Sequence, residues 1–365
     1  MSGVRYVVDG GKAKVKQFRT RLGLDSLLAK PISKSSALQR KGRAGREGEG
    51  KCYRLYTEKD YLALGKSSTP EILRSDVTQT VLTIKARGVD DIASFPFMTT
   101  PPREALEKAL LQLLTLGALE QDGSISSVGL RMAKLPLTPA LSRVLLAAAE
   151  PEMDCLAEAI DIISALTVEN IFLNLTSEEK REEAETARKD LLRREGDHLT
   201  LLTTVQKYIA ESTDRKAWAT RHFVSHRAMQ SVTVRTPREC SHCLLASALI
   251  AVQDVRKQLR NQCQRQKLLL SSSSSEPPTA VSPERAATII RCFLTGFASK
   301  TARLCPDGSY KTMIGNHPIA IHPSSGLFGR KVEAIVYNEY VFTNKSYAKG
   351  VSAVQMDWIG EALGV

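Results

Sequence analysis

The first sixty residues alternate between short apolar runs and basic segments, a pattern that predicts one part of an α/β domain. The apolar, β-branched run from Val4 to Asp9 predicts a buried strand, which two glycines end. Basic and apolar residues alternate from Lys12 to Lys30, which predicts a projecting basic hairpin. We expect a helix over 32–46 and a second strand over 51–57. A unit this small cannot bury its own sheet, so we interpret it as the end of a larger domain.

Helical periodicity dominates the next part of the chain. We expect a helix over 70–87, with a proline near its start, and a second helix over 102–117. The second helix carries a stripe of leucines, and its final glycine is a typical C-terminal signal. Asp122 and Gly123 form a strong hairpin-turn signal directly afterwards. Helices followed by a hairpin predict a winged helix over 61–135.

Residues 136–270 are almost entirely helical by period, and Asp197 is a suitable cap for a helix over 198–209. A further helix is expected over 218–232. The segment 233–253 then combines a proline with an apolar run that lacks a polar face. We interpret this segment as an insertion, with a translated intron as the simplest source, that loops out of a helical domain.

The remaining sequence changes to linker and β patterns. Residues 271–284 are rich in serine and proline and predict a linker. A short helix and short β segments predict a small barrel over 285–350, followed by a tail over 351–365. The expected β segments are Tyr310–Ile314, Pro318–His322, Glu333–Tyr337 and Tyr340–Asn344.

Charge and composition narrow the functional classes. The 365 residues carry a net charge of +12, and residues 1–60 hold fifteen Lys or Arg against six Asp or Glu, which favours a polyanionic partner. Seven cysteines without a disulfide framework indicate a reducing compartment. The longest apolar run, Cys243 to Val252, is too short to span a bilayer, and the N-terminus lacks the apolar core of a signal peptide. We therefore expect no membrane partner.

One basic stretch carries the candidate chemistry. If Ser35 or Ser36 caps its helix, Gln39, Arg43 and Arg46 fall at i, i+4 and i+7 and share one face. Guanidinium groups suit phosphate oxygens, and the glycines between them allow close approach of another surface. The stretch predicts arginine fingers directed at a nucleotide held elsewhere. The alternative is a solvated basic helix, which is the usual structure of an Arg-rich octamer.

A second group of side chains has zinc-binding chemistry. His222 and His226 are four residues apart, and Cys240 and Cys243 follow as a Cys-x-x-Cys pair. A single pair of this kind is weak evidence, and both cysteines fall inside the segment interpreted as an insertion. We therefore predict no metal site here.

Seven short sequence motifs, each occurring once, are spread along the chain. They are Val-Arg-Tyr-Val-Val-Asp-Gly-Gly at 4–11, Gln-Arg-Lys-Gly-Arg-Ala-Gly-Arg at 39–46, Cys-Tyr-Arg-Leu-Tyr at 52–56, Leu-Gly-Ala-Leu at 116–119, Glu-Gly-Asp-His-Leu at 195–199, Ala-Ile-His-Pro-Ser-Ser at 320–325 and Val-Tyr-Asn-Glu at 336–339. Together, and in this order, they resemble the C-terminal portion of the DEAH-box ATP-dependent RNA helicases of superfamily 2. The string Arg-Leu-Tyr-Thr-Glu at 54–58 is most similar to the ribosome-biogenesis branch.

This resemblance implies a multidomain α+β fold: a partial RecA-like α/β lobe over 1–60, a winged helix, a helical ratchet domain and a C-terminal OB-fold. It implies that Gln39, Arg43 and Arg46 contact the ATP phosphates. The hairpin would separate strands or grip RNA, and the ratchet and OB domains would hold single-stranded RNA mainly through its backbone. The candidate RNA-binding residues are Lys14, Lys16, Arg19 and Arg21 in the hairpin and Lys300 and Arg303 in the OB-fold, the last two being equally compatible with a solvated face.

The sequence departs from the family in one respect. It contains neither the phosphate-binding loop G-x-x-x-x-G-K-[ST] nor the Asp-Glu-Ala-His motif, and the nearest string ends in Cys52, which lacks the hydroxyl that ligates Mg²⁺. We expect ATP and Mg²⁺ to be held mainly by an upstream lobe, so that this chain alone is inactive. The parent enzyme would couple ATP hydrolysis to RNA translocation or unwinding in rRNA processing, as a nuclear or nucleolar monomer with an activator protein among its partners. The alternative is a non-catalytic RNA-binding adaptor.

Overall fold

The computed structural model describes residues 3–19, 24–168, 170–175, 177–232, 255–268, 281–342 and 345–363. The chain divides into two compact units, one formed by 1–112 with 341–344 and the other by 113–340 with 345–365. Within the described part of the chain, none of the helices combines the length and the apolarity needed to cross a membrane.

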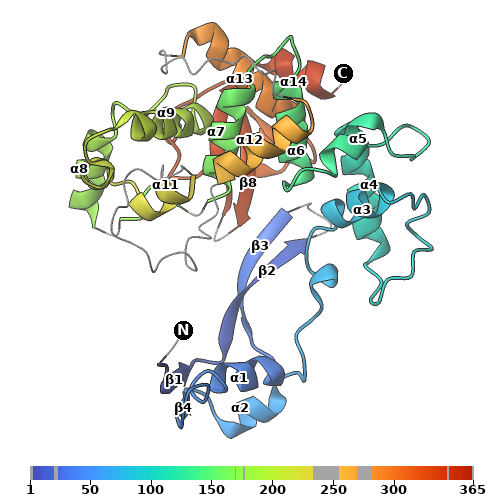
Figure 1. Ribbon diagram of the computed structural model, residues 1–365, viewed down its shortest axis with the longest axis vertical. Coiled ribbons are helices and arrows are strands. Elements are labelled where there is room, and N and C mark those ends of the chain that lie inside the picture. Colours follow the sequence, from blue (N-terminus) through green and yellow to red (C-terminus); the bar gives the residue numbers. More distant parts are fainter. Residues whose placement is uncertain are drawn as a thin grey trace. The chain divides into compact units, whose positions relative to one another are not determined.

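The first unit begins with the strand–hairpin–helix–strand order that the sequence predicts. Strand β1 (Tyr6–Asp9) pairs in parallel with β4 (Lys51–Arg54), and α1 (Lys34–Lys41) packs against β1. Strands β2 (Lys12–Arg19) and β3 (Leu24–Pro31) form a long antiparallel ribbon that leaves this small sheet (Figure 1). The predicted hairpin is therefore confirmed.

The prediction that the first strand is buried is wrong. Tyr6 and Val8 are 69% and 66% exposed, whereas Asp9 is buried. The reason is geometric, because β1 pairs only with β4 among the described strands and helix α1 covers one of its faces. Alternate side chains of a strand point to opposite faces, so the other face remains in solvent.

The helix expected over 32–46 ends earlier, at Lys41. Its N-cap is Ser33, whose hydroxyl accepts a hydrogen bond from the Ser36 backbone N–H, so the prediction of Ser35 or Ser36 as the cap is wrong. Residues 42–48 form turns instead of helix. A Cβ on Gly50 would lie 2.2 Å from the carbonyl oxygen of Ala44, so the chain turns back tightly here before it enters β4.

The helices that follow agree only in part with the sequence pattern. Helix α2 covers Glu58–Ala63, and a 3₁₀ turn covers Glu71–Leu73. The helix expected over 70–87 is shorter, because α3 covers Thr78–Lys85 and Asp76 accepts the backbone N–H of Thr78 at its start. The predicted helix over 102–117 is confirmed as α4 (Arg103–Thr115).

The predicted hairpin turn after α4 is also confirmed. Leu119 and Ile125 form an antiparallel bridge, and Gly123 between them has a φ of +82°. Helix α5 (Ser127–Met132) follows, with Ser126 as its N-cap. A helix followed by a small hairpin is the arrangement expected of a winged helix.

The second unit is mainly helical up to the barrel. Its remaining helices are α6 (Pro139–Ala148), α7 (Leu156–Leu166), α8 (Glu178–Ala187), α9 (Asp197–Ala210), α10 (Arg215–Arg221), α11 (His226–Val232), α12 (Val255–Arg265), α13 (Pro283–Phe297) and α14 (Met356–Leu363). The single helix expected over 218–232 is two helices, because Phe223 between α10 and α11 has a φ of +51°. Residues 233–254, which include the predicted insertion, lie outside the described residues.

The C-terminal strands close into a barrel in the order β5-β6-β7-β9-β8. The strands are β5 (Thr301–Leu304), β6 (Tyr310–Thr312), β7 (Pro318–Ile321), β8 (Ala334–Phe342) and β9 (Ser346–Val354). Two expected β segments are thus one continuous strand, β8, and the expected tail over 351–365 contains the end of β9 and helix α14. The linker expected over 271–284 also ends early, because Ser282 caps α13.

Candidate functional site

The side chain of Asp9 is the centre of a hydrogen-bond network in the first unit. It is fully buried at the end of β1, where Oδ1 accepts the Gly11 backbone N–H at 3.0 Å and Nη1 of Arg40 at 2.7 Å. Oδ2 accepts the hydroxyl of Tyr56 at 3.0 Å. Burial by itself raises the pKa of Asp9, but these three hydrogen bonds and the charge of Arg40 prevail and lower it. The network therefore holds α1 against the end of β1 through an ionised carboxylate.

The three predicted phosphate-binding side chains lie next to this network in sequence. Gln39 is in the last turn of α1, whereas Arg43 and Arg46 lie in the turns that follow, so the prediction that they share one helix face is wrong. All three are exposed, and none of them has a side-chain hydrogen bond or ion pair to another described residue. Two guanidinium groups and an amide close together in the chain are well suited to phosphate oxygens.

The predicted hairpin residues are placed in part. Lys14 is exposed on β2, at the position opposite Ala29. Lys16 and Arg19 lie on the same strand, opposite Leu27 and Leu24. Arg21 lies outside the described residues. The exposed Lys14 is thus available to a polyanion along the ribbon.

The two predicted RNA-binding residues of the barrel, Lys300 and Arg303, differ in their contacts within the protein. Nζ of Lys300 donates to the backbone oxygen of Asn338 at 2.9 Å and lies 5.6 Å from the centre of the Phe297 ring. Lys300 is therefore engaged within the protein. Arg303 is exposed on β5, and its position in the strand is directly opposite Lys311 on β6. Arg303 is therefore the exposed one of the two predicted barrel residues.

Asp197 has a different role from the predicted one. Gly196 occupies the N-cap position of α9, and the Asp197 side chain makes no cap hydrogen bond. Its Oδ1 accepts the backbone N–H of Gly326 at 2.9 Å, and its Oδ2 accepts that of Val351 at 2.8 Å. Burial raises the pKa of Asp197, although these hydrogen bonds oppose the shift. The residue joins the start of α9 to the barrel.

The neighbouring residue, His198, strengthens this junction. It is fully buried, with Nδ1 2.7 Å from Oγ of Ser352 and Nε2 3.1 Å from Oδ1 of Asn338. Its ring lies 4.5 Å from the ring of Phe293 on α13. Burial lowers the pKa of His198 to about 4, so the imidazole is neutral. His198 lies in the first turn of α9, and the string Glu-Gly-Asp-His at 195–198 marks this junction in the sequence.

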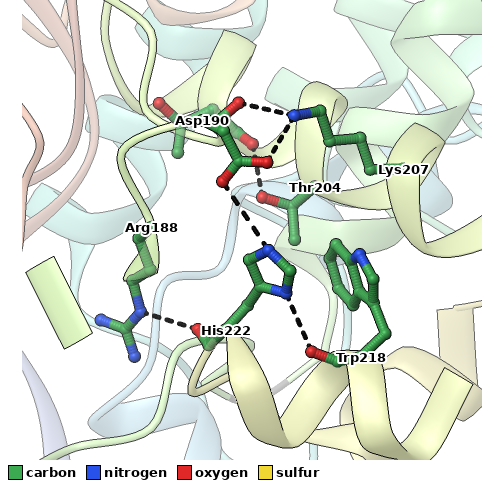
Figure 2. A network of polar contacts seen from close by, with 7 residues as sticks. Arg188, Asp190, Thr204, Lys207, Trp218 and His222 are labelled. Atoms are coloured by element: carbon green, nitrogen blue, oxygen red, sulfur yellow. Dashed lines mark hydrogen bonds and ion pairs between the residues drawn. The ribbon is translucent and has the colours of Figure 1, made fainter. Parts of the chain in front are cut away.

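Figure 2 shows how His222 is used in the helical region. Its Nδ1 lies 2.9 Å from the backbone oxygen of Trp218, and its ring stacks on the Trp218 ring. Because a carbonyl oxygen only accepts, Nδ1 donates and carries a proton. Nε2 faces Oδ1 of Asp190 at 3.7 Å, and Oδ2 of Asp190 forms an ion pair with Lys207 at 2.6 Å. Both ring nitrogens thus face protein groups.

Of the other residues considered for zinc, only His226 lies within the described residues. His226 begins the next helix, α11, and its Nδ1 lies 3.1 Å from the hydroxyl of Tyr208. Cys240 and Cys243 lie outside the described residues. No group of three or more metal-ligating side chains occurs among the residues that the structure describes.

Three protein-family models match the chain, in chain order. They describe the winged-helix part of the helicase-associated domain over 109–137, the ratchet-like part of that domain over 138–201 and an oligonucleotide/oligosaccharide-binding fold over 289–364. These matches overlap the predicted winged helix, the helical region and the barrel. The fold class is thereby confirmed for these three parts.

Several curated proteins are similar to almost the whole chain. The probable ATP-dependent RNA helicase DHR2 of Saccharomyces cerevisiae is 43% identical over 378 residues, which cover 100% of this chain and 48% of that protein. The pre-mRNA-splicing factor ATP-dependent RNA helicase prp22 of Schizosaccharomyces pombe is 36% identical, with 99% and 28% covered. The human ATP-dependent RNA helicase DHX33 is 33% identical, with 99% and 47% covered.

This chain spans about half or less of the length of these relatives. The matches to relatives over almost all of this chain, and the three domain matches in chain order, agree with the motifs found in the sequence. The chain belongs to the DEAH-box ATP-dependent RNA helicases and corresponds to a C-terminal portion of such an enzyme.

Proposed function

We propose that this chain serves as the C-terminal part of an RNA helicase in which Gln39, Arg43 and Arg46 contact the phosphates of ATP. The observation that carries the proposal is their placement, since all three are exposed beside a helix end that Arg40 and Asp9 hold in place. The segment fits phosphate oxygens, whereas it offers no carboxylate–hydroxyl set typical of a Mg²⁺ site. ATP and Mg²⁺ would therefore be held mainly by residues of a further lobe.

The role of the two arginines would be electrostatic. Charge builds up on the oxygens of the transferred phosphoryl group in the transition state, and positively charged guanidinium groups stabilise it. Gln39, which carries both a donor and an acceptor, can orient an attacking water molecule. RNA would contact the basic ribbon, from Lys12 to Lys30, and the barrel around Arg303. Residues 1–60 would belong to a RecA-like lobe.

The decisive experiment measures RNA-stimulated ATP hydrolysis in the whole protein. Replacing Arg43 or Arg46 with alanine should lower kcat by roughly 10³-fold or more if they are fingers. Lys41→Ala is the matched control, because Lys41 is an exposed cation on the same segment. A loss below about tenfold would assign both arginines to a solvated face. A whole protein that binds RNA but hydrolyses no ATP would support the adaptor instead.

We further propose a role in ribosome biogenesis, and hence in the nucleus or nucleolus. Its support is the string Arg-Leu-Tyr-Thr-Glu at 54–58, which is most similar to that branch of the family. Two of the relatives are named pre-mRNA-splicing factors, so splicing is the competing assignment. Ultraviolet cross-linking of the protein to RNA in cells would decide, since recovery of rRNA precursors supports the proposal and recovery of intron-containing pre-mRNA contradicts it.

A further inference from the structure

We propose that Arg40 is a positioning residue that links the phosphate-contacting segment to the base of the β2–β3 ribbon. It would thereby couple ATP hydrolysis to movement of RNA. The inference rests on the function proposed above and adds a role for a residue that the proposal assigns to neither ATP nor RNA.

The geometry of Arg40 carries this inference. Its Nη1 donates to Oδ1 of Asp9 at 2.7 Å, and its Nη2 donates to the backbone oxygen of Lys12 at 3.1 Å. Lys12 is the first residue of β2. Arg40 itself follows Gln39 directly and precedes Arg43 by three residues. One planar guanidinium group thus connects the end of β1, the start of the ribbon and the end of α1.

The partners of Arg40 are themselves fixed. The Asp9 side chain is fully buried and also accepts hydrogen bonds from Gly11 and Tyr56. The ribbon base is closed on its second strand, because the backbone N–H of Ile32 donates to the oxygen of Gly11 at 3.0 Å. A shift of α1 would therefore move both strands at the base of the ribbon together, since neither strand can slide independently there.

Because the Arg40 side chain makes two separate contacts, a substitution can keep the contact with Asp9 and remove the contact with Lys12. Lysine at position 40 keeps a positive charge for Asp9, but its single ammonium group cannot reproduce the fork that also reaches Lys12. Arg40→Lys should therefore keep α1 in place for the phosphate contacts and weaken the connection to the ribbon. Arg40→Ala should remove both contacts.

The test measures ATP hydrolysis and duplex unwinding in the same whole-protein sample, on an RNA duplex with a single-stranded overhang. The readout is the number of base pairs separated per ATP hydrolysed. We expect Arg40→Lys to lower this ratio by about threefold or more, a size typical of coupling residues, with ATP hydrolysis near the wild-type rate. Arg40→Ala should lower the ratio further and should also reduce hydrolysis.

Two control variants separate coupling from stability and charge. Tyr56→Phe removes another hydrogen bond to the same Asp9 carboxylate and leaves Arg40 intact, so it should lower the melting temperature and leave the ratio unchanged. Lys41→Ala removes an adjacent exposed charge and should leave both quantities unchanged.

Four outcomes would overturn the inference. A ratio that stays at the wild-type value in both Arg40 variants, or that falls equally in Tyr56→Phe, would reduce Arg40 to a stabilising residue. A wild-type protein without RNA-stimulated ATP hydrolysis would contradict the proposed function, and the coupling role with it. Active wild-type protein with an unchanged ratio in Arg40→Lys would contradict the coupling role alone.

Discussion

Nδ1 of His198 lies 2.7 Å from Oγ of Ser352, so the first turn of α9 and the last strand of the barrel share a buried polar contact. The adjacent Asp197 carboxylate accepts the backbone N–H of Val351 on the same strand. A Cβ on Gly196 would lie 2.5 Å from the Val351 oxygen, which shows how closely the two elements approach. Neighbouring residues of one motif therefore join the helical region to the barrel.

This contact predicts a pH dependence of stability. Burial lowers the pKa of His198 from 6.5 to about 4, so between these values the unfolded chain binds a proton that the folded chain does not. The free energy of unfolding should therefore fall as the pH falls from 6.5 to about 4, by about 3 kcal/mol from this residue at most. Urea unfolding of the purified chain at pH 7 and pH 5 measures the change.

The control for this prediction is His198→Gln. The raised pKa of Asp197 acts in the opposite direction, because the folded chain then binds the proton first as the pH falls. Comparing the variant with wild type at each pH removes this and other background titrations. The variant should show the shallower fall, and an equal fall in both proteins would assign the pH dependence to other groups.

Gly11 should be hard to replace. It has a φ of +69°, and an added Cβ would lie 2.7 Å from the Tyr56 ring. Gly11→Ala should therefore lower the free energy of unfolding by about 1–3 kcal/mol, through backbone strain and displacement of Tyr56. Gly10→Ala is the matched control, because a Cβ there has no atom within 4 Å and its φ is not positive. Equal melting temperatures for the two variants would contradict this geometry.

RNA binding should depend on the ribbon in a salt-dependent way. Replacing Lys14, Lys16, Arg19 and Arg21 together with alanine should flatten the slope of log affinity against log salt for single-stranded RNA, by about 0.7 for each lost phosphate contact. The control replaces four exposed lysines outside the ribbon, which are Lys41, Lys51, Lys59 and Lys66. If both quadruple variants change the slope equally, binding depends on net charge and the ribbon has no special place in the RNA path.

Removing Arg256 from its ion pair with Asp161 should be strongly destabilising, whereas removing both charges together should not. Nε of Arg256 lies 2.5 Å from Oδ1 of Asp161, whose side chain is 7% exposed, and burial raises the pKa of Asp161. Arg256→Ala leaves a buried carboxylate without its partner and should cost about 3–5 kcal/mol in unfolding free energy. The pair also attaches α12 to α7, which lies far away in sequence.

The double variant Asp161→Leu with Arg256→Met tests the reasoning, because it removes both charges at similar volume and should cost much less than Arg256→Ala. The exposed pair of Arg103 and Glu107 provides a surface comparison, and Arg103→Ala should scarcely change stability. A double variant as unstable as Arg256→Ala would show that packing of the two side chains, rather than charge, dominates at this site.

Much of the architecture could be predicted from local sequence. An Asp-Gly turn located the wing, the alternation of basic and apolar residues located the ribbon, and apolar periodicity located α4, because these features depend on neighbouring residues. The extents of elements were less predictable. The helix after Ser33 stops at Lys41 because the chain must return to β4 past Ala44 and Gly50, a constraint from residues outside the helix. The last barrel strand, β9, was missed, and its place between β8, the strand just before it in sequence, and the more distant β7 is set by closure of the barrel.

The sequence by itself determined the family, the order of the parts and the residue types of the candidate site, because motifs and periodicity are local properties. Only the tertiary structure decided how those residues are used. It separates the exposed Gln39, Arg43 and Arg46 from the engaged Arg40, and it turns an expected helix cap, Asp197, into a link to the barrel. The physical reason is that hydrogen-bond partners such as Asp9 and Val351 are brought close by folding, and no spacing along the chain encodes their distance.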